Sequence, residues 1–349
     1  MNNGNELSRM RKLAFSATAF LFGLALFGAV GAAGELVLRW VAPKSDPVKL
    51  GVRLENSARQ YGLRPNVRSI QTGVWVETNS LGFREKEYSL ERTAGVRRIA
   101  VLGDSYTQGV GVEFSETFSK RLEAELSRSG NAHEVINFGV SGYNTVMELA
   151  TFREVAAKFR PDLVIVAYVL NNTERWGSSG QVQEAGGEAR SRLTAAHEGL
   201  KGISTLYRYL SPKVGAVFGL FNARYAIGTT DQIIRSFEEN SLGWIESRQA
   251  LLDIAGEARK AGARTLVIVF PMMLDFATYP LGPAHDRITQ FCKDNGIDVL
   301  DLLSRFEHEK VSDLVVMLDG HPNSRAHRIF ADEILRYLSR RHPSPPASS

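Results

Sequence analysis

Short apolar runs recur between residues 97 and 302, and a polar or glycine-containing step follows most of them. The runs are Ile99–Leu102, Glu134–Phe138, Asp162–Leu170, Arg264–Phe270 and Ile297–Leu302. Runs of this length that are rich in β-branched residues are typical of strands buried on both faces. Segments of helical spacing lie between them, so the pattern predicts βαβ units, a mainly parallel sheet and right-handed crossovers.

Helical periodicity predicts the elements between and after these strands. Apolar residues recur every four positions from Phe114 to Leu126. A second helix is expected to begin near Thr145, and a last one over Ser324–Arg341 closes a main domain of residues 97–341. The tail, residues 342–349, is rich in proline and serine, a composition typical of disorder.

Two stretches depart from this alternation. Residues 43–96 have no sustained helical period, with a strand-like Val74–Val76 and a turn-like Asn79–Gly82. We expect them to form an N-terminal extension packed against the main domain. The insert, residues 173–240, follows the carboxyl end of a strand and is first glycine-rich and then aromatic. It is either a lid or substrate platform over a site, or a satellite packing cluster.

The N-terminal region is apolar enough to enter a membrane. After a basic tail (residues 1–12), residues 13–34 are uncharged. As a helix they span roughly 33 Å, against about 30 Å for a bilayer core. Small residues at 29–33 offer a cleavage site like that of a signal sequence. Apolar character continues to Trp40, which favours an uncleaved single-pass anchor with the bulk of the chain exported.

Composition narrows the classes of function. The chain is 44% hydrophobic and 23% charged, with a formal net charge of +4. These are ordinary globular values. Lys and Arg are scattered rather than concentrated, which gives no support to nucleic-acid binding. The single cysteine, Cys292, excludes an intrachain disulfide and is expected to be a buried filler of a helix.

Chemistry-bearing residues stand where the first strand ends. Gly103 terminates the run, and Asp104 and Ser105 follow at once. The carboxyl end of a buried strand is where open α/β sheets place their ligand sites. Ser105 would therefore present its hydroxyl at the mouth of the sheet. The alternative is that Asp104 and Ser105 only cap the following helix.

A serine nucleophile needs partners, and later loops supply them. Asp319 and His321 lie between a strand-like run, Leu314–Leu318, and the last helix. A histidine takes the proton of the serine, and a carboxylate commonly orients that histidine. The developing oxyanion needs fixed donors.

Three donors follow different strands of the predicted sheet. They are the N–H of Ser105, the N–H of Gly142 in a glycine-rich loop, and the side-chain amide of Asn171. Because the carboxyl ends of parallel strands share one edge of a sheet, these donors are expected to converge there.

The order of these blocks resembles the SGNH/GDSL hydrolase family. The blocks are Gly103-Asp104-Ser105, then Gly142, then Asn171, then Asp319-Gly320-His321. The resemblance covers residues 97 to about 338, apart from the insert. It implies a flavodoxin-like three-layer α/β/α sandwich with a five-stranded parallel sheet, preceded here by the transmembrane helix.

The resemblance also implies roles for the site residues. Ser105 would be the nucleophile, His321 the general base and Asp319 its partner. The N–H of Ser105, with Gly142 and Asn171, would form the oxyanion hole, and no cofactor or metal would be needed.

Two positions differ from the usual pattern of the family. Asn172 stands where the family usually has aspartate, which removes a charge beside the site and keeps the donor. Asp319-Gly320-His321 is one residue shorter than the usual Asp-x-x-His. Asp319 therefore either reaches the imidazole differently, or leaves His321 to be oriented by a backbone carbonyl.

These features predict a serine esterase of the deacetylase type that acts through an acyl-enzyme on acylated small molecules, lipids or polysaccharides. The alternatives are an O-acyltransferase on an exported polysaccharide and a non-catalytic binding module that retains the fold. A metal site made of Asp319, His321 and His327 is a rival interpretation. His285 and Asp286 are expected to be a surface pair.

Overall fold

The structure is a computed structural model that describes residues 3–41, 50–128, 132–173, 204, 206–207, 223–316 and 320–341. The chain divides into two compact units. One comprises Met1–Asp46 with Glu184–Phe221, and the other comprises Pro47–Gln183 with Asn222–Ser349. The tail from 342, Asp319 and most of the insert lie outside the described residues.

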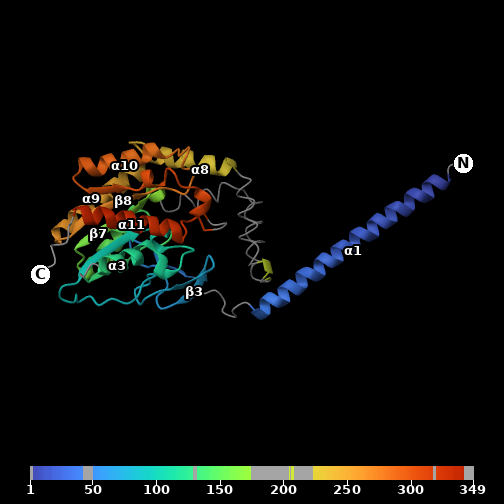
Figure 1. Ribbon diagram of the computed structural model, residues 1–349, viewed down its shortest axis with the longest axis horizontal. Helices are drawn as coiled ribbons and strands as arrows, with labels where there is room; N and C mark the ends of the chain where they lie inside the picture. Colours follow the sequence, from blue (N-terminus) through green and yellow to red (C-terminus); the bar gives the residue numbers. More distant parts are fainter. Residues whose placement is uncertain are drawn as a thin grey trace. The chain divides into compact units, whose positions relative to one another are not determined.

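A five-stranded parallel sheet forms the centre of the larger unit (Figure 1). Its strands are β5 (Arg97–Gly103), β6 (His133–Asn137), β7 (Leu163–Val169), β8 (Arg264–Phe270) and β9 (Asp298–Asp301). The spatial order is β6-β5-β7-β8-β9, and every neighbouring pair is parallel. The predicted sheet and its five strands are confirmed, with bounds that differ by at most two residues.

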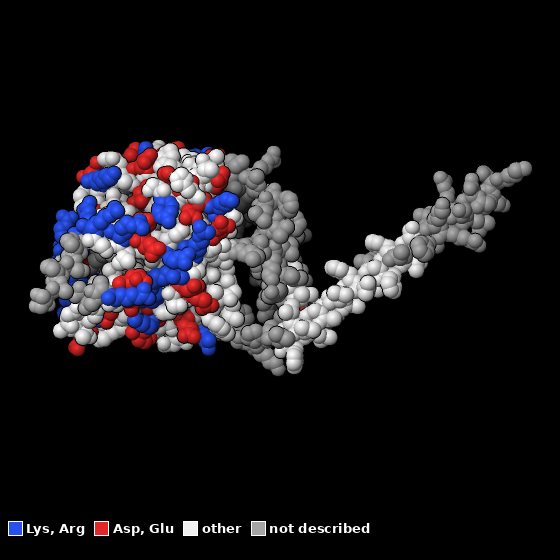
Figure 2. All heavy atoms as spheres, in the orientation of Figure 1, with Lys and Arg blue, Asp and Glu red and all other residues white. Residues whose placement is uncertain are grey.

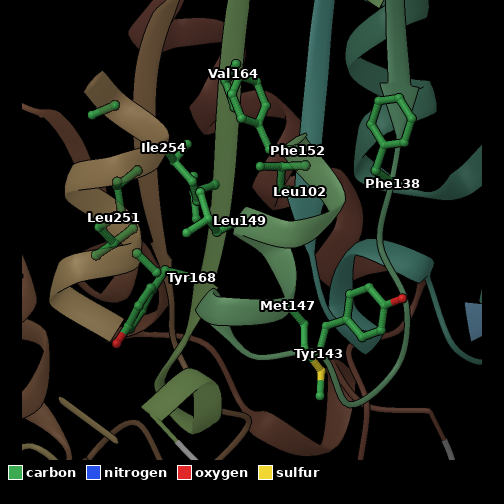
Figure 3. Packing of buried hydrophobic residues seen from close by; sticks show 14 of the residues in the cluster. Leu102, Phe138, Tyr143, Met147, Leu149, Phe152, Val164, Tyr168, Leu251 and Ile254 are labelled. Carbon is green, nitrogen blue, oxygen red and sulfur yellow. The ribbon is translucent and has the colours of Figure 1, made fainter. Parts of the chain in front are cut away.

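Alternate side chains of each strand enter two separate cores. On β5, Ala100 and Leu102 face one core, whereas Ile99 and Val101 face the other. The first core is closed by α4 (Thr145–Glu154), α9 (Leu242–Lys260) and α10 (Gly282–Asp294). Figure 3 shows part of it, with Leu102 and Val164 of the sheet close to Phe152 and Leu149 of α4.

The second core is closed by α3 (Phe118–Arg128) and α11 (Ser324–Arg341). Helices therefore cover both faces of the sheet, which is the three-layer α/β/α sandwich expected from the sequence. The last helix has the predicted bounds, and Cys292 is buried in α10 as expected.

Further helical segments join these elements. They are α2 (Ser105–Gln108), η1 (Phe114–Glu116), η2 (Ala156–Phe159), η3 (Leu170–Thr173), α8 (Ala223–Ser236), η4 (Leu303–Phe306) and η5 (Val311–Asp313). The predicted helix from Phe114 thus starts as one 3-10 turn and becomes α-helical at Phe118.

The segment before the sheet contains two antiparallel hairpins. β1 (Gly51–Arg53) pairs with β2 (Tyr61–Leu63), and β3 (Arg68–Gln71) pairs with β4 (Val74–Glu77). The buried Arg84 follows them, and its guanidinium donates to the backbone carbonyls of Trp75, Gln108, Gly109 and Val112. These bonds tie the segment to the loop after α2, since a buried guanidinium needs several acceptors.

The smaller unit contains α1 (Asn3–Val41), of which Phe20–Trp40 is long and apolar enough to cross a membrane. The helix has this property by its length and composition, which a signal sequence shares. Within this unit, Glu35 accepts hydrogen bonds from Ser204 Oγ and Leu206 N, both at 2.8 Å. In Figure 2 the described part of α1 is almost entirely uncharged, whereas basic and acidic side chains are interspersed on the visible face of the larger unit.

Two local predictions are wrong. The strand-like run Leu314–Leu318 forms no strand in its described residues. Val315 makes only an isolated bridge to Pro322, because the chain turns back within a few residues and leaves no length for a strand. His285 is not at the surface, since it is 1% exposed and its Nδ1 lies 2.8 Å from Asp301 Oδ1. Asp301 ends β9 and reaches back to α10, a contact that the local sequence does not contain.

Candidate active site

Ser105 lies in a tight turn at the carboxyl end of β5. A Cβ on Gly103 would lie 2.1 Å from Thr107 Oγ1, so the turn requires glycine there. Asp104 caps α2, because its Oδ1 accepts from Tyr106 N at 2.9 Å. Ser105 is the first residue of α2 and is 7% exposed. Asp104 therefore caps the helix, as the alternative interpretation expected, and Ser105 also lies at the edge of the sheet.

The buried Asp104 carboxyl interacts with several groups at this edge of the sheet. Burial raises its pKa to about 6, while the hydrogen bond from Tyr106 N, the nearby His321 and the Asn171 side chain act in the opposite direction. Both side chains can influence Asp104 in this way only if they lie close to it. The side chains of Asn171 and His321 therefore both approach the carboxyl of Asp104, the residue before Ser105.

His321 comes from the loop between η5 and α11. Gly320 has φ +85°, and His321 O accepts from Val316 N at 2.8 Å. The imidazole packs edge-on against Tyr106, with ring centroids 6.1 Å apart. The fold therefore brings the predicted base to the residue next to Ser105, although the predicted carboxylate partner, Asp319, lies outside the described residues.

Gly142 lies in the loop between β6 and α4. Val140 N donates to Gly103 O at 3.1 Å, which joins this loop to the end of β5. Gly142 has φ +82°, a conformation that favours glycine, and Asn144 caps α4 through Met147 N. Within the described ranges, the backbone hydrogen bonds of this loop include none donated by Gly142 N.

Asn171 follows β7 in η3, and its side chain lies close enough to Asp104 to lower the pKa of that carboxyl. Its neighbour Asn172 is turned away from solvent and donates Nδ2 to Glu148 Oε1 at 2.9 Å. Glu148 is a fully buried residue of α4 that the sequence pattern did not single out. A glutamate in the first turn of a helix is common in any sequence, so it gives no local signal that this one is buried.

His327 belongs to the core rather than to the mouth of the site. It is fully buried and stacks on Phe118, and its Nδ1 accepts from Phe118 N at 3.1 Å. Burial, followed by Arg121, Arg84 and His321, lowers its pKa to about 3. The neutral ring is therefore a packed hydrogen-bond acceptor. In the part of the chain that the structure describes, no three His, Cys, Asp or Glu side chains group as metal ligands.

A curated esterase is similar to part of this chain. It is 26% identical over 95 residues to the esterase TesA of Pseudomonas aeruginosa, an overlap of 27% of this chain and 47% of that protein. The chain thus spans about half the length of this curated relative.

Solved structures of esterases are also among the matches. A crystal structure of TesA matches with a TM-score of 0.42 and 16% identity, over 70% of this chain and 99% of that one. An acetyl-xylooligosaccharide esterase from Geobacillus Stearmophilus matches with a TM-score of 0.43 and 13% identity, over 69% and 93% of the two chains.

The family itself is shown by a longer match. Residues 101–329, more than half of the 349-residue chain, match the model of the GDSL-like lipase/acylhydrolase family. This region contains the Ser105 turn, the Gly142 loop, the Asn171 turn and the loop of His321. The chain therefore belongs to the GDSL-like lipase/acylhydrolase family, a family of ester-hydrolysing enzymes.

Proposed function

We propose that this protein is a serine-dependent acyl ester hydrolase that works through an acyl-enzyme intermediate. The observation that carries the proposal is the packing of His321 against Tyr106, the residue after Ser105, at 6.1 Å between ring centroids. A histidine held beside a serine at the carboxyl end of a parallel strand has the placement that a general base requires.

The proposed reaction has two balanced halves. Ser105 Oγ attacks the acyl carbon while His321 takes the hydroxyl proton, and collapse of the tetrahedral adduct breaks the ester C–O bond. The alcohol leaves with the proton from His321, and the acyl group stays on Ser105. A water then gives a proton to His321 and attacks the acyl carbon. Collapse of this second adduct breaks the bond between the acyl carbon and Ser105 Oγ, His321 returns its proton to Ser105 Oγ, and the carboxylic acid is released.

The proposed oxyanion hole has three donors: the N–H groups of Ser105 and Gly142 and the Asn171 amide. Asp104 is close enough to His321 for their charges to interact, so its carboxylate supports the imidazolium that forms in each half-reaction. Asp319 is proposed to orient the imidazole from the other side. None of these steps uses a metal or an organic cofactor.

The substrate class is proposed to be an acylated small molecule, lipid or polysaccharide. Residues 13–34 are proposed to anchor the chain in a membrane, uncleaved, with residues 97–341 exported as the catalytic domain. Protease accessibility in intact cells, compared with lysed cells, tests that topology. Protection of the domain in intact spheroplasts would contradict it.

Labelling with a fluorophosphonate tests the proposed chemistry. The full chain in detergent is expected to be labelled on Ser105, with no label in Ser105→Ala and a rate lowered on the order of a thousand-fold in His321→Ala, since triad members act as a unit. Ser339→Ala is the matched control, because it removes the hydroxyl of an exposed serine of α11, which donates to Leu335 O of the same helix. Equal labelling of Ser105→Ala and wild type would overturn it.

Hydrolysis and acyl transfer share the acyl-enzyme and are separated by its acceptor. With p-nitrophenyl esters of increasing chain length, a hydrolase releases free acid in proportion to p-nitrophenol. Adding oligosaccharide acceptors should leave that ratio unchanged. Recovery of the acyl group on the sugar would instead assign an O-acyltransferase.

A further inference from the structure

We propose that Tyr61 and Gln71, which precede the family-matched region, are positioning residues for the oxyanion-hole peptide between Ser141 and Gly142. This inference rests on the proposed function, because Gly142 is an oxyanion donor only in that reaction. Both residues belong to the hairpins of residues 51–77, a segment whose sequence pattern indicates no function.

Tyr61 holds the carbonyl end of this peptide. Its hydroxyl donates to Ser141 O at 2.9 Å. In a trans peptide the C=O and N–H groups point in opposite directions, so a bond that fixes Ser141 O also fixes the direction of the Gly142 N–H. A hydrogen bond accepted by the carbonyl polarises the peptide and makes the N–H a stronger donor.

Gln71 holds the preceding peptide through an intermediate side chain. Ser141 N donates to Gln108 Oε1 at 2.8 Å, and Gln108 Nε2 donates to Gln71 Oε1 at 2.7 Å. Because Gln71 accepts from the amide nitrogen, the oxygen of the fully buried Gln108 must face Ser141. Ser141 is therefore held at its N–H and at its carbonyl, in both cases by way of the hairpins.

The fit around Gly142 is close. A Cβ at this position would lie 2.6 Å from the Tyr61 hydroxyl. The Tyr61 ring packs edge-on against Tyr143 at 5.3 Å between centroids, and the Tyr143 hydroxyl donates back to Tyr61 O at 2.5 Å. Tyr143 in turn belongs to the first core, beside Met147 (Figure 3). The Tyr61 hydroxyl thus has little freedom to leave Ser141.

Tyr61 remains a neutral donor over the range in which an esterase works. Burial, followed by Tyr143 and Asp104, raises the pKa of its phenol far above the ordinary value. The influence of Asp104 also places the Tyr61 hydroxyl near the Ser105 turn. The hairpins therefore complete an edge of the site whose nucleophile and base come from the family-matched region.

The test compares Tyr61→Phe and Gln71→Leu with wild type in the full-length protein. Tyr88→Phe is the matched control, because it removes a phenol of the same segment that bonds Glu123 and Lys120 instead of Ser141. Tyr61→Phe is expected to lower kcat for p-nitrophenyl acetate roughly ten-fold with KM unchanged. A donor that is loosened should cost less than the hundred-fold or more that follows from losing one.

Fluorophosphonate labelling of Ser105 should slow by a similar factor, because the phosphonyl oxygen occupies the same hole. Gln71→Leu should have the same effect in kind, and Tyr88→Phe should match wild type. Unchanged kcat and labelling in Tyr61→Phe, with Ser105 labelled normally in wild type, would overturn this inference and leave the proposed function intact.

A second readout does not depend on activity. Hydrogen exchange of peptides covering residues 139–144 should be faster in both variants than in wild type and in Tyr88→Phe. If wild type is not labelled at all, the proposed function fails, and exchange still tests the positioning. Unchanged exchange at 139–144 would then contradict it, even if Tyr61→Phe alone lowers the melting temperature.

Discussion

The side-chain amide of Asn172 donates to Glu148 Oε1 at 2.9 Å, and both residues are buried. Burial, followed by the charge of Asp104, raises the pKa of Glu148 well above its ordinary value, and the bond from Asn172 acts against that rise. An aspartate at 172, as is usual in the family, would place a second carboxyl on Glu148. Asparagine at this position avoids that repulsion.

Asn172→Asp should therefore destabilise the protein in a pH-dependent way. Two buried carboxyls in contact hold a proton that the unfolded chain releases, so stability falls as pH rises. We expect a loss of about 2 kcal/mol or more at pH 8 and a smaller loss at pH 5, measured by urea unfolding. Equal losses at the two pH values would contradict this account.

The exchange variant is the control for that pair. Asn172→Asp combined with Glu148→Gln restores one amide and one carboxyl in contact, with their positions reversed. It should recover most of the stability lost in Asn172→Asp. A double variant as unstable as the sum of the two single variants would show that the residues do not interact.

Gly142→Ala should impair activity and stability together. Its φ of +82° strains any residue with a Cβ, and that Cβ would meet the Tyr61 hydroxyl at 2.6 Å. We expect a loss of roughly 1 kcal/mol or more of stability and about 100-fold in kcat/KM. Gly256→Ala is the matched control, since its Cβ would meet no atom within 4 Å and helix α9 should gain about 0.5–1 kcal/mol. Full activity in Gly142→Ala would exclude its proposed role.

His327 makes stability depend on pH on the acid side. The unfolded side chain binds a proton near the ordinary histidine pKa of 6.5, whereas burial lowers the pKa of the folded ring to about 3. The unfolded state therefore binds more protons in between, and stability is lost as pH falls from about 6.5 towards 3. His327→Leu leaves Phe118 N without its acceptor and should cost about 1–3 kcal/mol at pH 7.

At pH 4 the gap between His327→Leu and wild type should narrow, because the variant has no imidazole to protonate. Urea unfolding at the two pH values measures this difference. Contributions of other groups are common to both proteins and cancel. A gap of the same size at pH 7 and pH 4 would exclude His327 as the source.

Asp104 makes stability depend on pH in the opposite direction to His327, over an overlapping pH range. Burial raises its pKa from the ordinary 3.8 to about 6, so the folded state keeps a proton that the unfolded chain has released. Stability present at low pH is lost as pH rises from about 4 to 6. Asp104→Asn retains the acceptor for Tyr106 N and should be more stable than wild type at pH 8, on the order of 2 kcal/mol, with little difference at pH 4. The denaturant midpoints of Asp104→Asn and wild type, measured at pH 8 and at pH 4, test this expectation. Equal differences at the two pH values would contradict it.

Asp319→Ala should cost less activity than His321→Ala. The spacing between the two residues is one shorter than in the family, so a backbone carbonyl can share the task of orienting the imidazole. The measurement is kcat/KM for p-nitrophenyl acetate. Equal losses in the two variants would instead make Asp319 an indispensable partner.

Local sequence determined the layered fold and pointed to the sheet edge at which we propose the site. The run Asp162–Leu170 is long and β-branched enough to form a strand only in a buried sheet, and the spacing over Ser324–Arg341 is that of one helix. Ser105 is conspicuous because it is a polar residue directly after a buried strand. These signals depend on neighbours within a few positions, which a sequence displays.

Contacts between distant segments were decided by the tertiary structure alone. Glu148 meets Asn172, Tyr61 meets Ser141, and His285 meets Asp301 across gaps that no periodicity spans. A buried polar side chain must find a partner wherever the fold provides one, and the partner leaves no mark on the adjoining sequence. Local sequence thus indicated which residues are candidates for the chemistry, and tertiary packing decided which side chains hold the surrounding loops in position.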